Sequence, residues 1–302
     1  MDSKKIVQAA MDAHTIVPAF NIPHLPMVEP VVNAIVDEDS VAMIQVARLE
    51  WEKFQSQSPE AVAEEYFKYR KEGYTLLHLD HVPAIDEDMK KVDYISILKR
   101  ALGVGYQSVM VDASRLPLEE NIATTAEVAA LASEFGAAVE AELGAVSGHE
   151  GSGIGSYEEL FASKKGFTNP EEAKRFAKES GCDWLSVAAG SFHGAIAEST
   201  RNLKKPNARL DIEHIAALVE ATGNMPLVLH GGSGIEQDYI LRAIETGIAK
   251  INVGTEIRQA YEFALEEKPG NIVFAQEKVY DRVRDIIKNF LRTSGNHTRL
   301  VK

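Results

Sequence analysis

Short apolar runs rich in β-branched residues alternate along the chain with longer stretches in which apolar residues recur every three or four positions. The short runs are apolar nearly throughout, which is typical of parallel strands whose two faces are both covered. We expect strands at Thr15–Asn21, Val41–Val46, Thr75–Asp80, Gln107–Asp112, Ala138–Leu143, Trp184–Ala189, Pro226–His230 and Ala249–Val253.

The longer stretches have the period of amphipathic helices. One apolar stripe consists of Met27, Val28, Val31, Val32 and Ile35, and another of Val279, Val283, Ile286, Ile287 and Phe290. About eight strand–helix units in series predict an α/β fold, a single (β/α)8 TIM barrel spanning residues 1–302 as one domain. A doubly wound parallel sheet is the alternative, since spacing alone does not distinguish the two.

Composition and charge narrow the partners and the compartment. The net charge of −13 argues against nucleic acid or an anionic membrane as a partner, because both need a basic face. No apolar run approaches the ~20 residues of a transmembrane helix, and the first residues do not resemble a signal peptide. The single cysteine, Cys182, excludes an internal disulfide framework and fits a reducing compartment, so we expect a cytoplasmic protein.

Three histidines, His81, His193 and His230, each close a stretch that reads as a strand, and each is followed by a turn. The stretches are Thr75–His81, Trp184–His193 and Pro226–His230. Three imidazoles at the carboxyl ends of barrel strands form the ligand set of a catalytic zinc site with one position open for substrate. Cobalt or iron would also suit such ligands. Asp80, directly before the first histidine, is a candidate acid/base.

Two carboxylates, Glu142 and Asp112, also stand at strand ends. A buried carboxylate without a cation is costly, so we expect each to face the metal or an arginine. Each is therefore a candidate metal ligand or a group that orients one, and a salt bridge in the barrel mouth is the structural alternative.

Small residues follow the seventh and eighth strands, in Gly231-Gly-Ser-Gly234 and Asn252-Val-Gly-Thr255. Barrels often bind phosphate at these two loops, where backbone N–H groups approach the anion closely. Tight turns alone would also explain the glycines. The long connections Ala145–Phe167 and from His193 to about Pro206 are candidate lids, with ordinary surface loops as the alternative.

A metal beside a phosphate site indicates polarisation of a carbonyl or an alcohol on a phosphorylated substrate. A Schiff-base enzyme would need a lysine at a strand end, whereas Lys250 lies within the eighth strand. A zinc-dependent hydrolase stays open, although the first strand lacks the His-x-His pair of the amidohydrolase type.

The motifs together resemble one family, the class II, metal-dependent ketose-bisphosphate aldolases, which includes the fructose- and tagatose-bisphosphate enzymes. The matching blocks, in chain order over roughly residues 15–258, are Pro18-Ala-Phe-Asn21, Leu79-Asp-His81, Val109-Met-Val-Asp-Ala-Ser114, Glu140-Ala-Glu-Leu-Gly144, His193-Gly194, Leu229-His-Gly-Gly-Ser-Gly234 and Lys250-Ile-Asn-Val-Gly-Thr-Glu256.

The resemblance implies a homodimer or homotetramer that reversibly cleaves a ketose phosphate into dihydroxyacetone phosphate and an aldehyde. It implies Zn2+ on the three histidines, with Glu142 as an additional or alternative ligand. Asp80 is similar to the family's acid/base for the C4 hydroxyl, and Glu150 to the glutamate that handles the dihydroxyacetone-phosphate proton. The expected substrate and phosphate contacts are Asn21, Gly194, Gly231, Ser233, Asn252, Gly254 and Thr255, with a monovalent cation (Na+ or K+) near the phosphate.

This chain departs from the family pattern where the aldehyde half would bind. Ala47 stands where the family often has a phosphate-binding serine, and Arg48 follows it; Gly254 stands where fructose enzymes often carry aspartate. The loop motif around Glu150 lacks the usual Gly-Gly before its acid. Arg258 matches an arginine that family members contribute across a subunit interface to the distal phosphate.

These departures predict a substrate other than fructose bisphosphate, such as tagatose bisphosphate or a ketose with another distal acid. Arg48 would bind that acid, or would simply pair with Glu50 or Glu52. The alternatives in function are a sugar-phosphate-binding barrel of weak activity and a zinc-dependent hydrolase.

Overall fold

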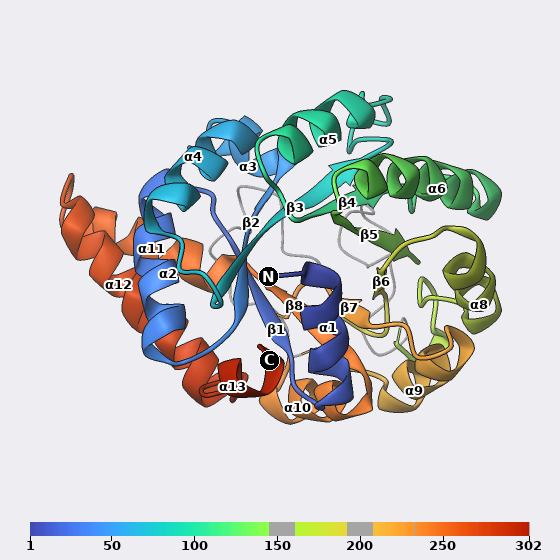
Figure 1. Cartoon of the computed structure of the whole chain (residues 1–302). Coiled ribbons are helices and arrows are strands. Elements are labelled where there is room, and N and C mark those ends of the chain that lie inside the picture. The colour runs from blue at the N-terminus through green and yellow to red at the C-terminus, as the bar shows by residue number, and fades with distance from the viewer. Residues whose placement is uncertain (145–160, 192–207, 233, 302) are drawn as a thin grey trace.

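The structure, a computed structural model, describes residues 1–144, 161–191, 208–232 and 234–301. Eight parallel strands close into a barrel in chain order, with β8 paired to β1 (Figure 1). The strands are β1 Val17–Asn21, β2 Ala42–Ala47, β3 Thr75–Pro83, β4 Ser108–Asp112, β5 Ala138–Leu143, β6 Trp184–Val187, β7 Leu227–Leu229 and β8 Ile248–Val253. The predicted (β/α)8 barrel is confirmed, and closure excludes the doubly wound sheet.

The expected strand boundaries agree with the structure within a few residues. The largest difference is in β3, which continues past Asp80 to Pro83. The β6 strand ends at Val187, before the predicted Ala189. The short apolar runs therefore located every strand, because a barrel strand is buried on both faces.

Helices surround the barrel and alternate with the strands (Figure 1). They are α1 Ser3–Asp12, α2 Val28–Asp37, α3 Arg48–Lys53, α4 Pro59–Tyr69, α5 Tyr94–Gly103, α6 Leu118–Glu134, α8 Pro170–Glu179, α9 Ile212–Ala221, α10 Gln237–Thr246, α11 Thr255–Glu267, α12 Ile272–Asp285 and α13 His297–Leu300, with short helical turns at Leu25–Met27 and Ile286–Phe290.

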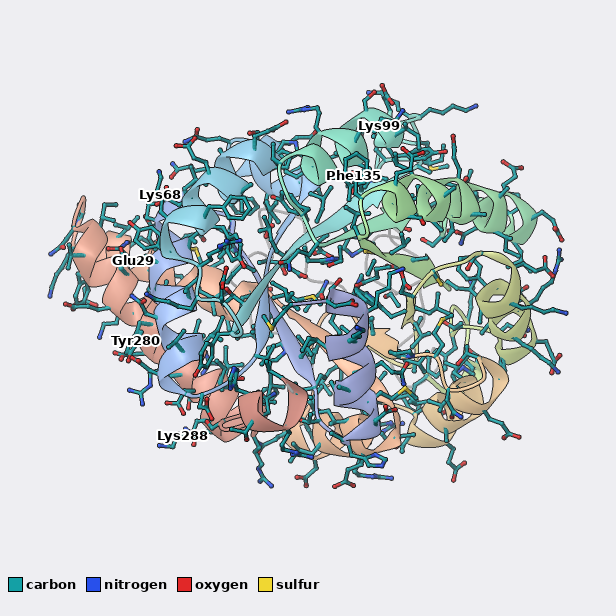
Figure 2. All side chains as sticks on the ribbon, viewed as in Figure 1. Glu29, Lys68, Lys99, Phe135, Tyr280 and Lys288 are labelled. Carbon is teal, nitrogen blue, oxygen red and sulfur yellow. The ribbon has the colours of Figure 1, made fainter. Side chains whose placement is uncertain are left out.

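Polar side chains start several of these helices. Asp93, Asn169, Asp211 and Asn271 each accept a hydrogen bond from a backbone N–H in the first turn of the helix that follows. Such caps satisfy donors that have no partner within the helix. The outer faces carry charged side chains such as Lys68, Lys99 and Lys288, which Figure 2 shows at the rim of the molecule.

Two apolar clusters hold the barrel. The larger lies between the strands and the outer helices, and includes the predicted stripe of α2. The smaller fills one end of the barrel interior, where Ile6, Val7 and Ala10 of α1 pack with Val17, Met43 and other strand residues. Because α1 covers the amino-terminal ends of the strands, the polar side chains inside the barrel lie toward the carboxyl ends. No helix among the described residues is long and apolar enough to span a membrane.

Candidate active site

An irregularity in β3 aims two neighbouring residues at the same place. The register between β3 and β4 shifts between Leu79 and Val82, and His81 has a φ of +36°. In a regular strand, Asp80 and His81 would point to opposite faces. A bulge re-aims a side chain, and a positive φ outside glycine is a strained state that recurs at functional sites.

Asp80 is buried, with 2% of its surface exposed, and three amide groups donate hydrogen bonds to it. Asn21 Nδ2 lies 3.0 Å and Gln45 Nε2 3.2 Å from Oδ2, and Asn252 Nδ2 lies 3.0 Å from Oδ1. Burial alone would raise the pKa of Asp80, but the positive charges of His81, His230 and Lys250 lower it to about 2. The carboxylate is therefore ionised and held in one orientation.

His81 lies between two carboxylates. Its Nδ1 is 3.5 Å from Asp112 Oδ2, and its Nε2 is 4.0 Å from Glu142 Oε2. Asp112 is itself held by Ser114, whose Oγ and backbone N–H donate to Oδ1 at 2.6 and 3.0 Å. Burial would lower the pKa of His81, but Asp80, Asp112 and Glu142 raise it to about 10. The surrounding charge thus favours a cation at this position.

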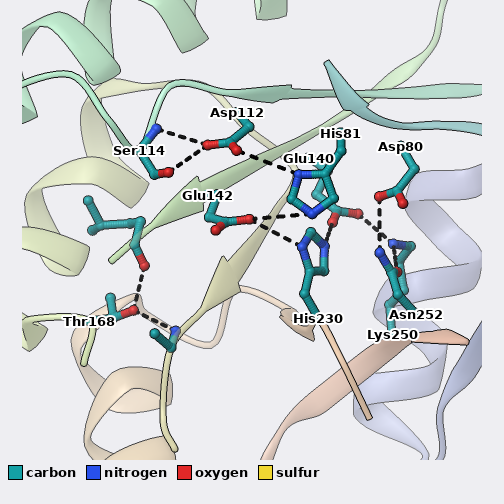
Figure 3. Close-up of polar contacts among 12 residues, drawn as sticks. Asp80, His81, Asp112, Ser114, Glu140, Glu142, Thr168, His230, Lys250 and Asn252 are labelled. Atoms are coloured by element: carbon teal, nitrogen blue, oxygen red, sulfur yellow. Dashed lines mark hydrogen bonds and ion pairs between the residues drawn. The ribbon is translucent and has the colours of Figure 1, made fainter. Parts of the chain in front are cut away.

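His230 follows β7 and is held by two carboxylates of β5 (Figure 3). Its Nε2 lies 2.6 Å from Glu140 Oε1, and its Nδ1 lies 3.2 Å from Glu142 Oε2. The rings of His81 and His230 are 4.5 Å apart. Nε2 therefore carries a proton and donates a hydrogen bond to Glu140, and Nδ1 is directed toward His81 and Glu142.

The donor set of this cluster fits a divalent cation. Asp80, His81 and His230 form one group of candidate ligand atoms within 4.8 Å of one another, and His81, Asp112 and Glu142 form a second. Glu142 Oε2 is buried and faces the ring nitrogens of His230 and His81 at 3.2 and 4.0 Å, but it accepts no well-formed hydrogen bond from the residues the structure describes. Imidazole nitrogens with carboxylate oxygens are ligands that suit zinc. A cation beside Glu142 would stabilise this oxygen.

Beneath these side chains lies a layer of polar residues that we did not predict as functional. Glu140 is fully buried, with Oε2 2.9 Å from Lys250 Nζ and 2.6 Å from Trp184 Nε1. His78 Nε2 lies 3.5 Å from the same oxygen. The signal was present in the sequence, because His78, Glu140 and Lys250 each stand two positions before a polar residue already considered. Residues two apart share one face of a strand.

The glycine loops lie beside Asn21 and Asn252. Gly231 has a φ of +75°, and a Cβ on Gly232 would meet Ile251 Cδ1 at 2.7 Å. A Cβ on Gly254 would lie 3.4 Å from Asn21 Cβ, so Gly254 borders a residue that holds Asp80. Thr255 begins α11, whose amino terminus attracts anions.

The two arginines singled out in the sequence have partners within the chain. Arg48 Nη2 lies 2.8 Å from Glu52 Oε1, as in the structural alternative considered above. Glu50 turns the other way: its Oε2 accepts from Ala47 N at 2.7 Å and Asn21 Nδ2 at 3.3 Å. Arg258 is 9% exposed and pairs with Glu262 on its own helix.

Four of the predicted site residues lie outside the described residues: Glu150, His193, Gly194 and Ser233. Most of the two long connections considered as lids lies there too, at residues 145–160 and 192–207. Their predicted roles stay predictions. Among the other predicted residues, the structure brings Asp80, His81, Asp112, Glu142 and His230 together.

The fold and the cluster define a class: a (β/α)8 barrel with histidines and carboxylates that could hold a metal at the carboxyl ends of its strands. The family described as "Fructose-bisphosphate aldolase class-II" matches residues 1–298. The chain therefore belongs to the class II fructose-bisphosphate aldolase family, and the resemblance inferred from the motifs is confirmed.

Individual relatives agree with the family. Fructose-bisphosphate aldolases of Streptococcus pyogenes serotypes M3 (strain MGAS315) and M1 are each 40% identical to this chain over 178 residues, or 59% of this chain and 55% of theirs. The match thus spans about half the length of these curated relatives. Among solved structures, the YdjI aldolase of Escherichia coli K12 has a TM-score of 0.77 at 26% identity, covering 98% of both chains. A putative fructose-1,6-biphosphate aldolase of Coccidioides immitis has a TM-score of 0.76, also at 26% identity and 98% coverage of both chains.

Proposed function

We propose that this protein is a zinc-dependent aldolase that reversibly cleaves a ketose phosphate into dihydroxyacetone phosphate and an aldehyde. Family membership supports the reaction class. The observation that carries the proposal is the placement of Asp80, an ionised carboxylate held by three amides, beside the imidazoles and carboxylates around His81 and His230.

His81 and His230 would hold the zinc together with His193, with Glu142 as an additional or alternative ligand and Asp112 orienting His81. When bound, zinc would polarise the ketose carbonyl and stabilise the negative charge that develops as the carbon–carbon bond breaks. The fit rests on the imidazole and carboxylate donors and on the Glu142 oxygen that accepts no well-formed hydrogen bond from the described residues.

Asp80 would accept the proton of the C4 hydroxyl. Because Asn21, Gln45 and Asn252 fix both of its oxygens, the base needs no reorientation when substrate binds. Glu150 is the proposed acid for the dihydroxyacetone-phosphate carbon.

The phosphate of the triose half would bind at the loops after β7 and β8. Gly231, Asn252 and Thr255 supply backbone or side-chain donors there, with Gly194 and Ser233 as further proposed contacts. A sodium or potassium ion near that phosphate belongs to the same proposal. For Arg258 to bind the distal phosphate in a neighbouring subunit of a homodimer or homotetramer, its ion pair with Glu262 would have to break.

Release of dihydroxyacetone phosphate from fructose or tagatose bisphosphate tests the reaction, with Asp80→Asn as the matched variant. We expect the variant to bind zinc and to lose about 10²–10⁴-fold in kcat, the usual contribution of a positioned base. Zinc bound without cleavage of any ketose phosphate would favour the sugar-phosphate-binding barrel. Hydrolysis without a released aldehyde would favour the zinc hydrolase.

The finer proposal is that fructose bisphosphate is not the preferred substrate. Gly254 places no side chain beside Asn21, and Arg48, which follows the end of β2, is a cation paired with Glu52. Arg48 would bind a distal acid of the substrate in competition with Glu52.

The variants Arg48→Ala and Glu52→Gln separate the two explanations of Arg48. If Arg48 binds the substrate, Arg48→Ala lowers kcat/KM for tagatose bisphosphate, and Glu52→Gln raises it because the guanidinium is released. Values of kcat/KM unchanged from wild type in both variants, together with a clear preference of the wild-type protein for fructose bisphosphate, would contradict the specificity proposal. The aldolase proposal would remain intact.

A further inference from the structure

One buried cation, Lys250, connects the residues around His230 with the residues that hold Asp80. Lys250 has no exposed surface and lies on β8, with its ammonium 2.9 Å from Glu140 Oε2 and 2.6 Å from Asn252 Oδ1. Glu140 lies on β5, so this ion pair crosses the interior of the barrel. Because an unpaired buried charge is costly, removing either side chain would leave the other as a destabilising unpaired charge.

On one side the contacts of Lys250 lead to His230. Glu140 uses Oε1 for His230 Nε2, at 2.6 Å, while Oε2 accepts from Lys250 and from Trp184 Nε1. A carboxylate held on both oxygens fixes the ring plane and the tautomer of the histidine it contacts. Nδ1, 3.2 Å from Glu142 Oε2, is then the nitrogen presented to a metal.

On the other side the contacts lead to Asp80. Asn252 turns its Oδ1 to the ammonium and therefore presents Nδ2 to Asp80 Oδ1, at 3.0 Å. An amide that faced the other way would bring its NH2 group against the ammonium. The orientation of one hydrogen-bond donor to Asp80 thus depends on Lys250.

We propose that Lys250 is a positioning residue that sets the metal-binding tautomer of His230 through Glu140 and the orientation of Asp80 through Asn252. We assign it no nucleophilic role, since its ammonium is buried and contacts both Glu140 and Asn252. This inference rests on the proposed function, because it assigns His230 to the metal and Asp80 to proton transfer.

The direct test is the zinc affinity of Lys250→Met, measured by competition with a chelator. Methionine keeps much of the side-chain length and removes the charge. We expect zinc affinity to fall about 10–100-fold, as for other groups that orient a metal ligand, and kcat to fall as well. Lys250→Arg should retain more of both. Lys4→Met removes an ion pair with Asp183 at the opposite end of the barrel and should change neither.

A double-mutant cycle separates positioning from a merely structural role. If Lys250 acts through Glu140, the double variant Lys250→Met/Glu140→Gln should bind zinc no more weakly than Glu140→Gln alone. The double variant leaves no unpaired buried charge, so it also serves if Lys250→Met alone fails to fold. Additive losses of zinc affinity, or a folded Lys250→Met with wild-type zinc affinity and kcat, would overturn the inference.

Tryptophan fluorescence gives a readout that needs no substrate. The chain has 2 tryptophans, so Trp51→Phe leaves Trp184, which donates to Glu140. In that background zinc should change the Trp184 emission, and Lys250→Met should reduce the change. If the wild-type protein neither binds zinc nor cleaves a ketose phosphate, the proposed function fails first. If it does both and these variants behave like wild type, only the role of Lys250 is wrong.

Discussion

At the scale of single residues, the protonation states of the site depend on the burial and the neighbours of each carboxyl group. Asp80 is kept ionised by nearby cations, whereas Glu50, which shares the Asn21 amide with it, is shifted in the opposite direction. Burial raises the pKa of Glu50 to about 8, and Asp80 adds to the rise, although hydrogen bonds from Ala47 N and Asn21 oppose it. Two carboxyls joined by one amide therefore differ in protonation at neutral pH.

This shift predicts the pH dependence of stability. The folded protein keeps a proton on Glu50 between its ordinary pKa of 4.5 and about 8, whereas the unfolded chain has released it. The contribution of Glu50 is therefore fully present below pH 4.5 and is lost as pH rises toward and through about 8. In chelator-treated protein, Glu50→Gln should become progressively more stable than wild type over that range, measured by urea unfolding. A constant difference from pH 5 to 9 would contradict the shift.

The residue-scale part of the site was only partly predictable from sequence. Asp80, His81, His230, Glu142 and Asp112 were expected near the carboxyl ends of the strands, which a parallel barrel brings together. The prediction that His81 ends its strand was wrong, because β3 continues to Pro83. The bulge that lets Asp80 and His81 share one site was not expected, since the strand pattern continues smoothly through it. The partners of Arg48 and Glu50 depend on side-chain packing at the rim, which no local pattern fixes.

At the scale of elements, the ends of β5 and β6 are joined by one threonine. Thr168 Oγ1 donates to Leu143 O at 2.5 Å and accepts from Ala188 N at 2.8 Å (Figure 3). Gly144 passes directly over it with a φ of +98°. Because Glu142 lies just before this turn, its position depends on the same contact.

Gly144→Ala should therefore destabilise the protein. A Cβ there would lie 2.6 Å from Thr168 Oγ1 and 3.1 Å from its backbone, in addition to the unfavourable φ. We expect a loss of about 1–3 kcal/mol in the free energy of unfolding, the usual cost of such a backbone state. The matched control is Gly103→Ala at the end of α5, where a Cβ would meet nothing within 4 Å. Equal stability of the two variants would show that the turn relaxes freely.

At the element scale the sequence was most informative about strands and least about the layer of polar residues inside them. Apolar runs located all the strands because burial on both faces leaves little ambiguity. The ion pair between Glu140 and Lys250 could not be predicted from the sequence. It depends on which side chains of β5 and β8 meet across the barrel, and strand order alone does not determine that.

At the scale of the whole molecule, α1 and its apolar cluster close one end of the barrel and leave the other end to polar side chains. The cluster there combines four carboxylates with three histidines and one lysine; its described members are Asp80, Asp112, Glu140, Glu142, His78, His81, His230 and Lys250. Lys250 offsets Glu140, and the remaining carboxylates raise the pKa of His81. A divalent cation would supply the charge that the protonated imidazole otherwise provides.

The most direct test is to measure cleavage of tagatose and fructose bisphosphates, by release of dihydroxyacetone phosphate, as free zinc is set with a chelator. We predict that cleavage disappears when zinc is removed and returns on titration in proportion to zinc bound. The half-saturating zinc concentration should rise sharply in His230→Ala. Cleavage that survives complete removal of metal, or that is unchanged in a folded His230→Ala, would contradict the assignment of this cluster as the catalytic zinc site.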